Sequence, residues 1–210
     1  MKDVNFKNIY NKLKILFPNP KCELIFHDGY SLLVAVILSA QCTDKRVNQV
    51  MPNFLLKYPT VYDLAKADVD EVGEVIKSCG FFNTKSFNLV ECAKKIVNEF
   101  NGVVPDNMED LISLNGVGRK TANVVLSNIY NVPAIAVDTH VFRVSNRIGL
   151  SKSNNVIDCE KQLMNNIEKN YWSEMHYLLV LFGRYYCKAI KPLCDKCILS
   201  DICKERVCKK

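Results

Sequence analysis

The sequence predicts an all-α protein with two lobes, and three observations support this. Apolar residues recur at three- and four-residue spacing along most of the 210 residues, as in amphipathic helices. Convincing strand alternation is absent, and the short apolar run at residues 132–137 is expected to be an extended connection. Cysteines gather near the end of the chain, which suggests a separate small lobe there.

The spacing predicts eleven helices joined by short polar turns, which is typical of a compact bundle. Start signals are expected at Thr43, Thr84 and Asp106, whose side chains can cap a following helix. Glycines 80, 102 and 149 lie where helices are expected to end. The expected ranges are 6–17, 31–40, 45–58, 61–65, 69–78, 84–100, 108–114, 120–130, 139–148, 156–167 and 171–186.

The charge is moderately basic and unevenly spread. The chain has 28 Lys and Arg against 22 Asp and Glu, a net charge of +6. Residues 184–210 contain eight basic and three acidic side chains, so their net charge of +5 nearly accounts for the excess. This segment is either a solvated charged tail or a basic surface that contacts phosphates. Its basic residues are Arg184, Lys188, Lys191, Lys196, Lys204, Arg206, Lys209 and Lys210.

The N-terminal residues show no secretory signal, because residues 1–14 are polar and no long apolar run follows them. The longest apolar stretch, Leu32 to Leu38, is far too short to span a bilayer. We therefore expect a soluble, intracellular protein. Because the cytosol is reducing, the ten cysteines need an explanation other than disulfides.

Residues 111–121 suggest a helix-hairpin-helix. Asn115, Gly116 and Gly118 can take positive φ, so the chain can reverse tightly between two helices. A glycine also lets a phosphate approach the backbone amides, and the start of the second helix favours an anion. Val117 can fill the gap between the helices. An ordinary helix–helix turn is the alternative, but the length of the element and the basic residues after it favour a phosphate-binding hairpin.

Two side chains near this element are candidates for chemistry. Lys120 is expected in the first turn of the second helix, where the helix dipole disfavours a cation. It is either a surface lysine near a phosphate or an activated nucleophile. Asp138 is expected to cap the helix that starts at Thr139, and a carboxylate there could also stabilise a developing sugar cation. The two roles of Asp138 are compatible.

Four cysteines have the spacing C-x6-C-x2-C-x5-C, which lets them surround one metal centre. A structural zinc site usually has two close C-x2-C pairs, and only one close pair exists here. An iron–sulfur cluster is also held by four thiolates, and the ligand chemistry favours it only slightly over zinc. Of the other cysteines, Cys208 is expected in a tail and five are expected to pack in the interior: Cys22, Cys42, Cys79, Cys92 and Cys159. The four cysteines of the spacing are Cys187, Cys194, Cys197 and Cys203.

Taken together, these motifs resemble the endonuclease III family of DNA glycosylases over almost the whole chain. The resemblance is carried by residues 32–44 (LLVAVILSAQCTD), 115–126 (NGVGRKTANVVL) and 136–144 (AVDTHVFRV), together with the cysteine spacing. It implies that Lys120 is the nucleophile, that Asp138 is the catalytic carboxylate and that the four cysteines hold a [4Fe-4S] cluster. Two departures are small: Asn115 replaces a common proline, and Phe182 replaces a histidine often seen there.

The resemblance also implies a two-lobed helix-hairpin-helix glycosylase fold. A six-helix domain would span residues 20–132, with the hairpin at about 108–130. An iron–sulfur cluster domain would combine residues 1–19 and 133–210, with the cluster loop at 187–203. DNA would lie across the groove between them. The implied DNA-binding residues are Gln41, Phe81, Asn115, Gly116, Val117, Gly118, Arg119, Lys188 and Lys191.

The function implied is a bifunctional DNA N-glycosylase and abasic-site lyase of base excision repair. It would remove oxidised pyrimidines from double-stranded DNA and cleave the strand 3′ to the abasic site by β-elimination. We expect a monomer in the cytoplasm of a prokaryote-like cell, with no membrane partner. Two alternatives stay open: a DNA-binding module without catalysis, and a monofunctional glycosylase that activates water and needs Asp138 but not Lys120.

Overall fold

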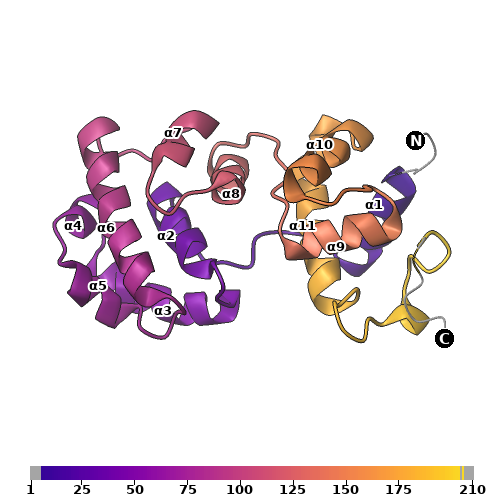
Figure 1. The fold of residues 1–210 in the computed structure, drawn as a ribbon, viewed down its shortest axis with the longest axis horizontal. Coiled ribbons are helices and arrows are strands. Elements are labelled where there is room, and N and C mark those ends of the chain that lie inside the picture. Colours follow the sequence, from indigo (N-terminus) through magenta and orange to yellow (C-terminus); the bar gives the residue numbers. More distant parts are fainter. Residues whose placement is uncertain (1–5, 204, 206–210) are drawn as a thin grey trace. The chain divides into compact units, whose positions relative to one another are not determined.

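The computed structural model describes residues 6–203 and 205, and its regular structure within these ranges is entirely helical (Figure 1). The chain divides into two compact units. One unit is Cys22–Val132, and the other combines Met1–Lys21 with Pro133–Lys210. None of the described helices is long and apolar enough to cross a membrane. The all-α prediction is therefore confirmed.

The unit formed by residues 22–132 is organised around helix α2 (Gly29–Ser39). Residues 31–38 of this helix are all buried, so α2 is surrounded by other elements instead of lying on a surface. It contacts α3, α6 and α8, which Figure 1 shows around it. The other helices are α3 (Asp44–Lys57), α4 (Val61–Ala65), α5 (Val69–Val75), α6 (Phe82–Glu99), α7 (Met108–Ser113) and α8 (Arg119–Ile129).

The second unit is built from both ends of the chain. In Figure 1 the indigo helix α1 lies among the orange and yellow helices of residues 133–203. Its core packs apolar side chains of α1, α9, α10 and α11 against the cysteine-rich segment. The elements are α1 (Phe6–Leu16), α9 (Thr139–Ile148), α10 (Val156–Asn166), α11 (Trp172–Tyr185) and two short 3-10 helices, η1 (Lys169–Tyr171) and η2 (Cys194–Lys196).

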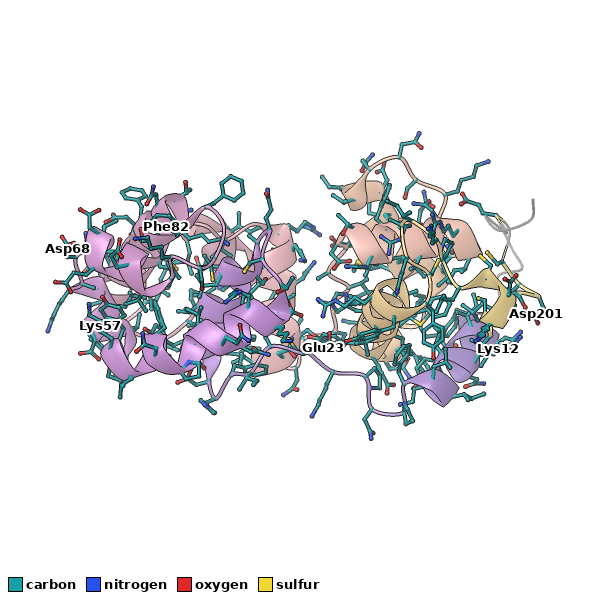
Figure 2. All side chains as sticks on the ribbon, turned by 90° about the horizontal axis from the view of Figure 1, so that it is seen from below. Lys12, Glu23, Lys57, Asp68, Phe82 and Asp201 are labelled. Carbon is teal, nitrogen blue, oxygen red and sulfur yellow. The ribbon has the colours of Figure 1, made fainter. Side chains whose placement is uncertain are left out.

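Polar contacts attach α1 to this unit. Lys12 Nζ lies 2.6 Å from a carboxylate oxygen of Asp201, and Figure 2 shows the two side chains together. Glu174 on α11 accepts hydrogen bonds from Lys14 and Tyr10. Partial burial would raise the pKa of Glu174, but these hydrogen bonds outweigh it and lower that pKa. The N-terminal helix is therefore held both to α11 and to the segment that carries the cysteines.

All eleven predicted helices are present in the described chain, with ends within three residues of the expected ones. Two cap predictions are wrong. Helix α6 begins at Phe82 and not after Thr84, because Phe81 turns the chain with a left-handed backbone (φ 59°). Asn107, and not Asp106, caps α7, because its side chain accepts the Asp110 amide at 2.9 Å. Residues 132–137 have no regular structure, as predicted.

The cysteines outside the spacing are not all interior residues. Cys79, Cys92 and Cys159 are buried, as predicted. Cys22 and Cys42 are partly exposed, so the expectation that they pack in the interior is wrong. Both lie in connecting segments, outside the helices whose apolar faces form the core. Cys208 and four basic residues of the tail, Lys204, Arg206, Lys209 and Lys210, lie outside the described residues.

Replacing Asp28 tests how the central helix begins. Asp28 accepts the Ser31 amide at 2.7 Å, and the Ser31 hydroxyl accepts the Asp28 amide at 3.0 Å, which forms a capping box. We expect Asp28→Ala to lower the free energy of unfolding by about 1 kcal/mol in urea denaturation. Asp28→Asn keeps the acceptor and should lose much less. Equal losses in the two variants would contradict this role of the cap.

Candidate active site and DNA-binding surface

The hairpin forms as the sequence predicts, with α7 and α8 joined by residues 114–118. The Val117 amide donates to the Leu114 carbonyl at 3.1 Å, and the Val117 side chain is buried. Gly116 has φ +76°, and a Cβ there would lie 3.0 Å from Asn88 Cβ. Asn115 does not take positive φ, and Gly118 has φ −98°. Of the three positions expected to have this freedom, only Gly116 uses it, because one left-handed residue reverses the chain.

Gly118 keeps the start of α8 open. It is the N-cap residue, it has no side chain to cap the helix, and a Cβ built on it would meet nothing within 4 Å. The first amides of an α-helix have no partner within the helix, and together with the helix dipole they attract anions. Arg119 and Lys120 are exposed in the same turn. This end of α8 is therefore suited to a phosphate.

Three of the residues expected to contact DNA have a left-handed backbone conformation. Gln41, Phe81 and Lys191 have φ of 53°, 59° and 51°. Among the described residues other than glycine, only Asn101 and Asn131 share this conformation, and asparagine tolerates it better than most residues. All three side chains are exposed, and Phe81 keeps 65% of its accessible surface. Strained backbone of this kind is often retained at functional sites.

Asp138 caps α9, as predicted. Its Oδ1 accepts the amides of His140 and Val141, both at 2.8 Å, while Oδ2 takes part in neither bond. The residue is half-buried. Two amides fix the orientation of the carboxylate, and one oxygen is left for another partner. The geometry thus allows capping and chemistry at the same time.

The first turn of α9 is packed tightly against α11. A Cβ on Gly183 would lie 2.8 Å from His140 Cβ, so a glycine is needed at this crossing. Arg143 Nη2 lies 2.9 Å from the Gly183 carbonyl and 3.2 Å from His140 Nδ1. Burial lowers the pKa of His140, and the nearby guanidinium groups of Arg143 and Arg184 lower it further against the opposing effect of Asp138. The lowered pKa favours the neutral imidazole, whose Nδ1 lies within hydrogen-bond distance of Arg143.

The structure brings the four predicted cysteines together. They line one pocket, which is partly open to solvent. Burial raises the pKa of the Cys197 thiol, and the adjacent Cys187 and Cys203 thiols raise it further, although a Leu199 backbone hydrogen bond opposes them. Thiolates crowded in this way repel one another unless a cation binds between them. The remaining lining residues are Arg147, Ile148, Phe182, Tyr186, Pro192 and Leu193.

The described side chains, as they stand, form no group of three or more His, Cys, Asp or Glu that could hold a single metal ion. The chemistry of the donor set nevertheless fits an iron–sulfur group, because four thiols and otherwise mainly apolar side chains line one space. No other described residues offer a comparable set.

Two arginines that the sequence analysis missed connect α9 to the cysteine segment. Arg143 Nε donates to the Cys187 carbonyl at 3.0 Å. Arg147 Nη1 donates to the Lys188 carbonyl at 2.8 Å and lies 3.6 Å from Cys187 Sγ. The Cys203 thiol in turn lies 3.5 Å from the Arg147 carbonyl. Their spacing of four residues places both arginines on one face of α9, which is the signal that could have identified them.

The loop between Cys187 and Cys194 presents the two predicted lysines to solvent. Lys188 and Lys191 are exposed, and Arg147 holds the backbone between them through the carbonyls of Lys188 and Ala189. The basic side chains are therefore displayed from a loop that α9 supports.

A helix-hairpin-helix followed by an aspartate that caps the next helix is typical of a class of DNA repair proteins, and the comparisons agree. The model of the HhH-GPD superfamily base excision DNA repair protein matches residues 34–169. The Endonuclease III of Bacillus subtilis (strain 168) is 43% identical over 96% of this chain and 94% of its own length. The Endonuclease III of Synechocystis sp. is 46% identical over 91% of this chain and 88% of its own length.

Solved structures give the same result. A trapped Endonuclease III–DNA covalent intermediate has a TM-score of 0.92 and 41% identity, and covers 96% of this chain and 95% of that one. A thermostable thymine-DNA glycosylase, at 24% identity and a TM-score of 0.86, shares the fold. This chain belongs to the endonuclease III family of base excision repair enzymes, which are DNA glycosylases with AP lyase activity. The resemblance inferred from the motifs is confirmed.

Gly118 provides a test of the phosphate site that leaves the fold intact. In Gly118→Ala the new methyl group meets nothing within 4 Å, so stability should change by less than about 1 kcal/mol. The methyl group would nevertheless crowd a phosphate on the α8 amides, so we expect weaker binding to duplex DNA in fluorescence anisotropy.

The matched control is Gly116→Ala, which forces alanine into φ +76° and should cost about 1–2 kcal/mol of stability. Unchanged DNA affinity in a folded Gly118→Ala protein would contradict a phosphate at this position.

Proposed function

We propose that this protein removes oxidised pyrimidines from double-stranded DNA and then cleaves the strand 3′ to the abasic site by β-elimination. Lys120 would be the nucleophile, and Asp138 would be the carboxylate that assists it. The observation that carries this assignment is the exposed Lys120 in the first turn of α8, directly after a hairpin with an open helix start. A damaged pyrimidine stacks poorly, so extruding it from the helix costs less than extruding a normal base.

The chemistry of a primary amine supports a bifunctional enzyme. Lys120 Nζ attacks C1′ of the sugar, and the base leaves with the C1′–N bond electrons and takes up a proton. The resulting amine adduct opens the sugar to a Schiff base. Loss of a C2′ proton then expels the 3′ phosphate, which breaks the strand. Water frees the lysine from the product.

Asp138 is suited to stabilise positive charge as the base departs. Its Oδ1 is engaged by the two α9 amides, and Oδ2 takes part in neither bond. A carboxylate fixed before the reaction stabilises a developing sugar cation without having to reorganise. It can also accept and return the protons that move between the amine and the sugar.

DNA would be held by backbone amides and basic loops and probed by two turns. The α8 amides, Lys188 and Lys191 would contact phosphates, while Gln41 would fill the space left by an extruded base and Phe81 would act as an apolar wedge. The exposure of these side chains and the left-handed backbones of Gln41, Phe81 and Lys191 support these roles. Asn115, Gly116, Val117 and Arg119 would complete the hairpin contact.

Cys187, Cys194, Cys197 and Cys203 would hold a [4Fe-4S] cluster. Support comes from their shared pocket and from the crowding of their thiols. A zinc ion needs four sulfurs at about 2.3 Å, whereas a cluster accepts thiols spread around a larger space. The cluster would fix the loop that displays Lys188 and Lys191. We further propose that the enzyme acts as a monomer and is associated with the nucleoid in the cytoplasm of a prokaryote-like cell.

The first test uses a labelled duplex with one thymine glycol, with and without borohydride. We expect a nicked strand and a protein–DNA adduct trapped by reduction of the Schiff base. Lys120→Gln should lose both, because an amide cannot form the Schiff base, while it should still bind the duplex. An adduct trapped by folded Lys120→Gln would show that the nucleophile is a different residue.

Other outcomes of that assay separate the alternatives. Base release without an adduct would indicate a monofunctional glycosylase that activates water. Binding without base release would leave a DNA-binding module or an enzyme for another lesion, and a panel of damaged bases would distinguish these two.

Two Asp138 variants separate capping from catalysis. Asn keeps an oxygen that can accept both α9 amides, so Asp138→Asn should retain its stability but excise the base at least about 100-fold more slowly. Asp138→Ala loses the cap as well, and should also lose about 1 kcal/mol of stability. Thermal melts and single-turnover rates give the two readouts. Full activity in Asp138→Asn would show that the negative charge is not needed.

Metal analysis tests the cysteine site. Purified protein should contain about four iron and four sulfide per chain. Cys197→Ala should lose most of both, whereas Cys92→Ala, which changes a buried cysteine on α6, should retain them. One zinc and no sulfide would show that the site holds a zinc ion.

A further inference from the structure

Two cysteines that the proposed mechanism does not use lie beside the two turns expected to probe DNA. Cys42 follows Gln41 directly, and Cys79 is separated from Phe81 only by Gly80. Cys79 is fully buried, while Cys42 is partly exposed. Both belong to the unit formed by residues 22–132, so their arrangement is internal to one compact body.

The two turns lie against each other beside these cysteines. A Cβ built on Gly80 would lie 3.5 Å from the Gln41 carbonyl oxygen, so the backbones next to Cys79 and Cys42 are close. The two thiols also interact electrostatically, which places their side chains near each other. Segments about forty residues apart therefore meet at two turns that each carry a cysteine.

A buried lysine lies next to this pair. Lys85 is only 5% exposed, and its Nζ donates to the Leu38 carbonyl at 2.8 Å, which is a neutral acceptor. Burial lowers the pKa of Lys85, and the charges that oppose this effect are those of Cys42 and Cys79. A buried cation without a carboxylate partner is costly, and this one gives the cysteine pair a positively charged neighbour.

The same electrostatics divides the roles of the two thiols. Burial and the Cys42 thiol together raise the pKa of Cys79 to about 11, although Lys85 and Arg46 act in the opposite direction. Reactive cysteines are those that are accessible to solvent and close to cations. Cys42 is the accessible member of the pair and Cys79 is the enclosed one. Cys42 is thus placed to react first and Cys79 to react with its product.

We propose that Cys42 and Cys79 form a reversible disulfide when a peroxide oxidises the protein, and that this bond ties the Gln41 turn to the Phe81 turn. The Cys42 sulfur attacks hydrogen peroxide and breaks the O–O bond, and the hydroxide that leaves takes the Cys42 thiol proton, which gives a sulfenic acid and one water. The Cys79 sulfur then attacks the sulfenic sulfur, and the hydroxide that leaves takes the Cys79 proton to form a second water. Two thiols and one peroxide become one disulfide and two waters, and a cellular dithiol reverses the step.

The bond would limit the motion of the two turns. Insertion of side chains into DNA requires loops that can adjust, so a covalent link between them should slow base excision. This consequence rests on the proposed function, since it assumes that Gln41 and Phe81 contact DNA. The formation of the disulfide does not, and the two can be tested separately.

Peptide mapping tests the disulfide itself. Holoenzyme is treated with equimolar hydrogen peroxide, its free thiols are blocked with N-ethylmaleimide, and it is digested with trypsin without reductant. We expect peptides 22–45 and 78–85 to be joined, with a mass lower by two hydrogens than the sum of the separate peptides. Because the first peptide also contains Cys22, the experiment is repeated in Cys22→Ala.

Variants of the pair provide the controls. Cys42→Ser should abolish the joined peptides, and so should Cys79→Ala and Cys79→Ser. Two replacements are made at Cys79 because it is buried, so that one folded variant remains if the other fails to fold. Cys92→Ala changes another buried cysteine of the same unit and should leave the joined peptides unchanged. Wild-type peptides that carry N-ethylmaleimide on both Cys42 and Cys79 after oxidation would overturn the proposal.

Excision of thymine glycol before and after oxidation tests the consequence. We expect the oxidised wild type to be slower and to recover with dithiothreitol, while Cys42→Ser is insensitive to the same treatment. Metal and sulfide content is measured in each sample, so that damage at the cysteine-lined pocket is not mistaken for the disulfide. Joined peptides with an unchanged excision rate would overturn the regulatory role. A reduced enzyme with no excision at all would instead contradict the proposed function.

Discussion

The capped helix α9 is the constraint on which the functional unit depends. Asp138 fixes its first turn through two backbone amides, and Arg143 and Arg147 extend from it to the cysteine segment. One rigid helix thus relates the candidate catalytic carboxylate to the loop that displays Lys188 and Lys191. The close crossing at Gly183 leaves no room for α9 to shift against α11. A displacement of the cysteine segment would therefore be transmitted to the position of Asp138 through helix α9.

The hairpin differs from the other elements because its second helix starts without a side-chain cap. Most helices in the described chain begin with a side chain that caps the first amides, as Asp28, Thr60 and Asn155 do. Helix α8 begins at Arg119, and its N-cap residue, Gly118, has no side chain that could cap the first turn. The energetic cost of an uncapped helix start is then recovered when an anion binds. Lys120 lies in the same turn, which would place the reacting amine next to the bound DNA backbone.

The turns at Gln41 and Phe81 combine an unfavourable backbone conformation with exposed side chains and nearby cysteines. Gln41 and Phe81 adopt left-handed backbones that most residues avoid, and this directs their exposed side chains outward from the ends of buried helices. Cys42 and Cys79 flank these turns in the sequence, and the buried Lys85 interacts electrostatically with both of them. The side chains that would contact DNA and the pair that would respond to oxidation are therefore parts of one local structure.

The sequence by itself determined the helices, the hairpin and the family, because these depend on local periodicity and on short motifs in a fixed order. It predicted the cap at Asp138 and the four cysteines, since both follow from spacing along the chain. Only the tertiary structure showed that Arg143 and Arg147 reach the cysteine segment and that the Gln41 turn meets the Phe81 turn, because these contacts join residues about forty positions apart and no local pattern encodes them. The same reason explains the incorrect predictions at Thr84 and Cys42: the turn at Phe81 and the exposure of Cys42 are set by packing between segments, which overrides local preference.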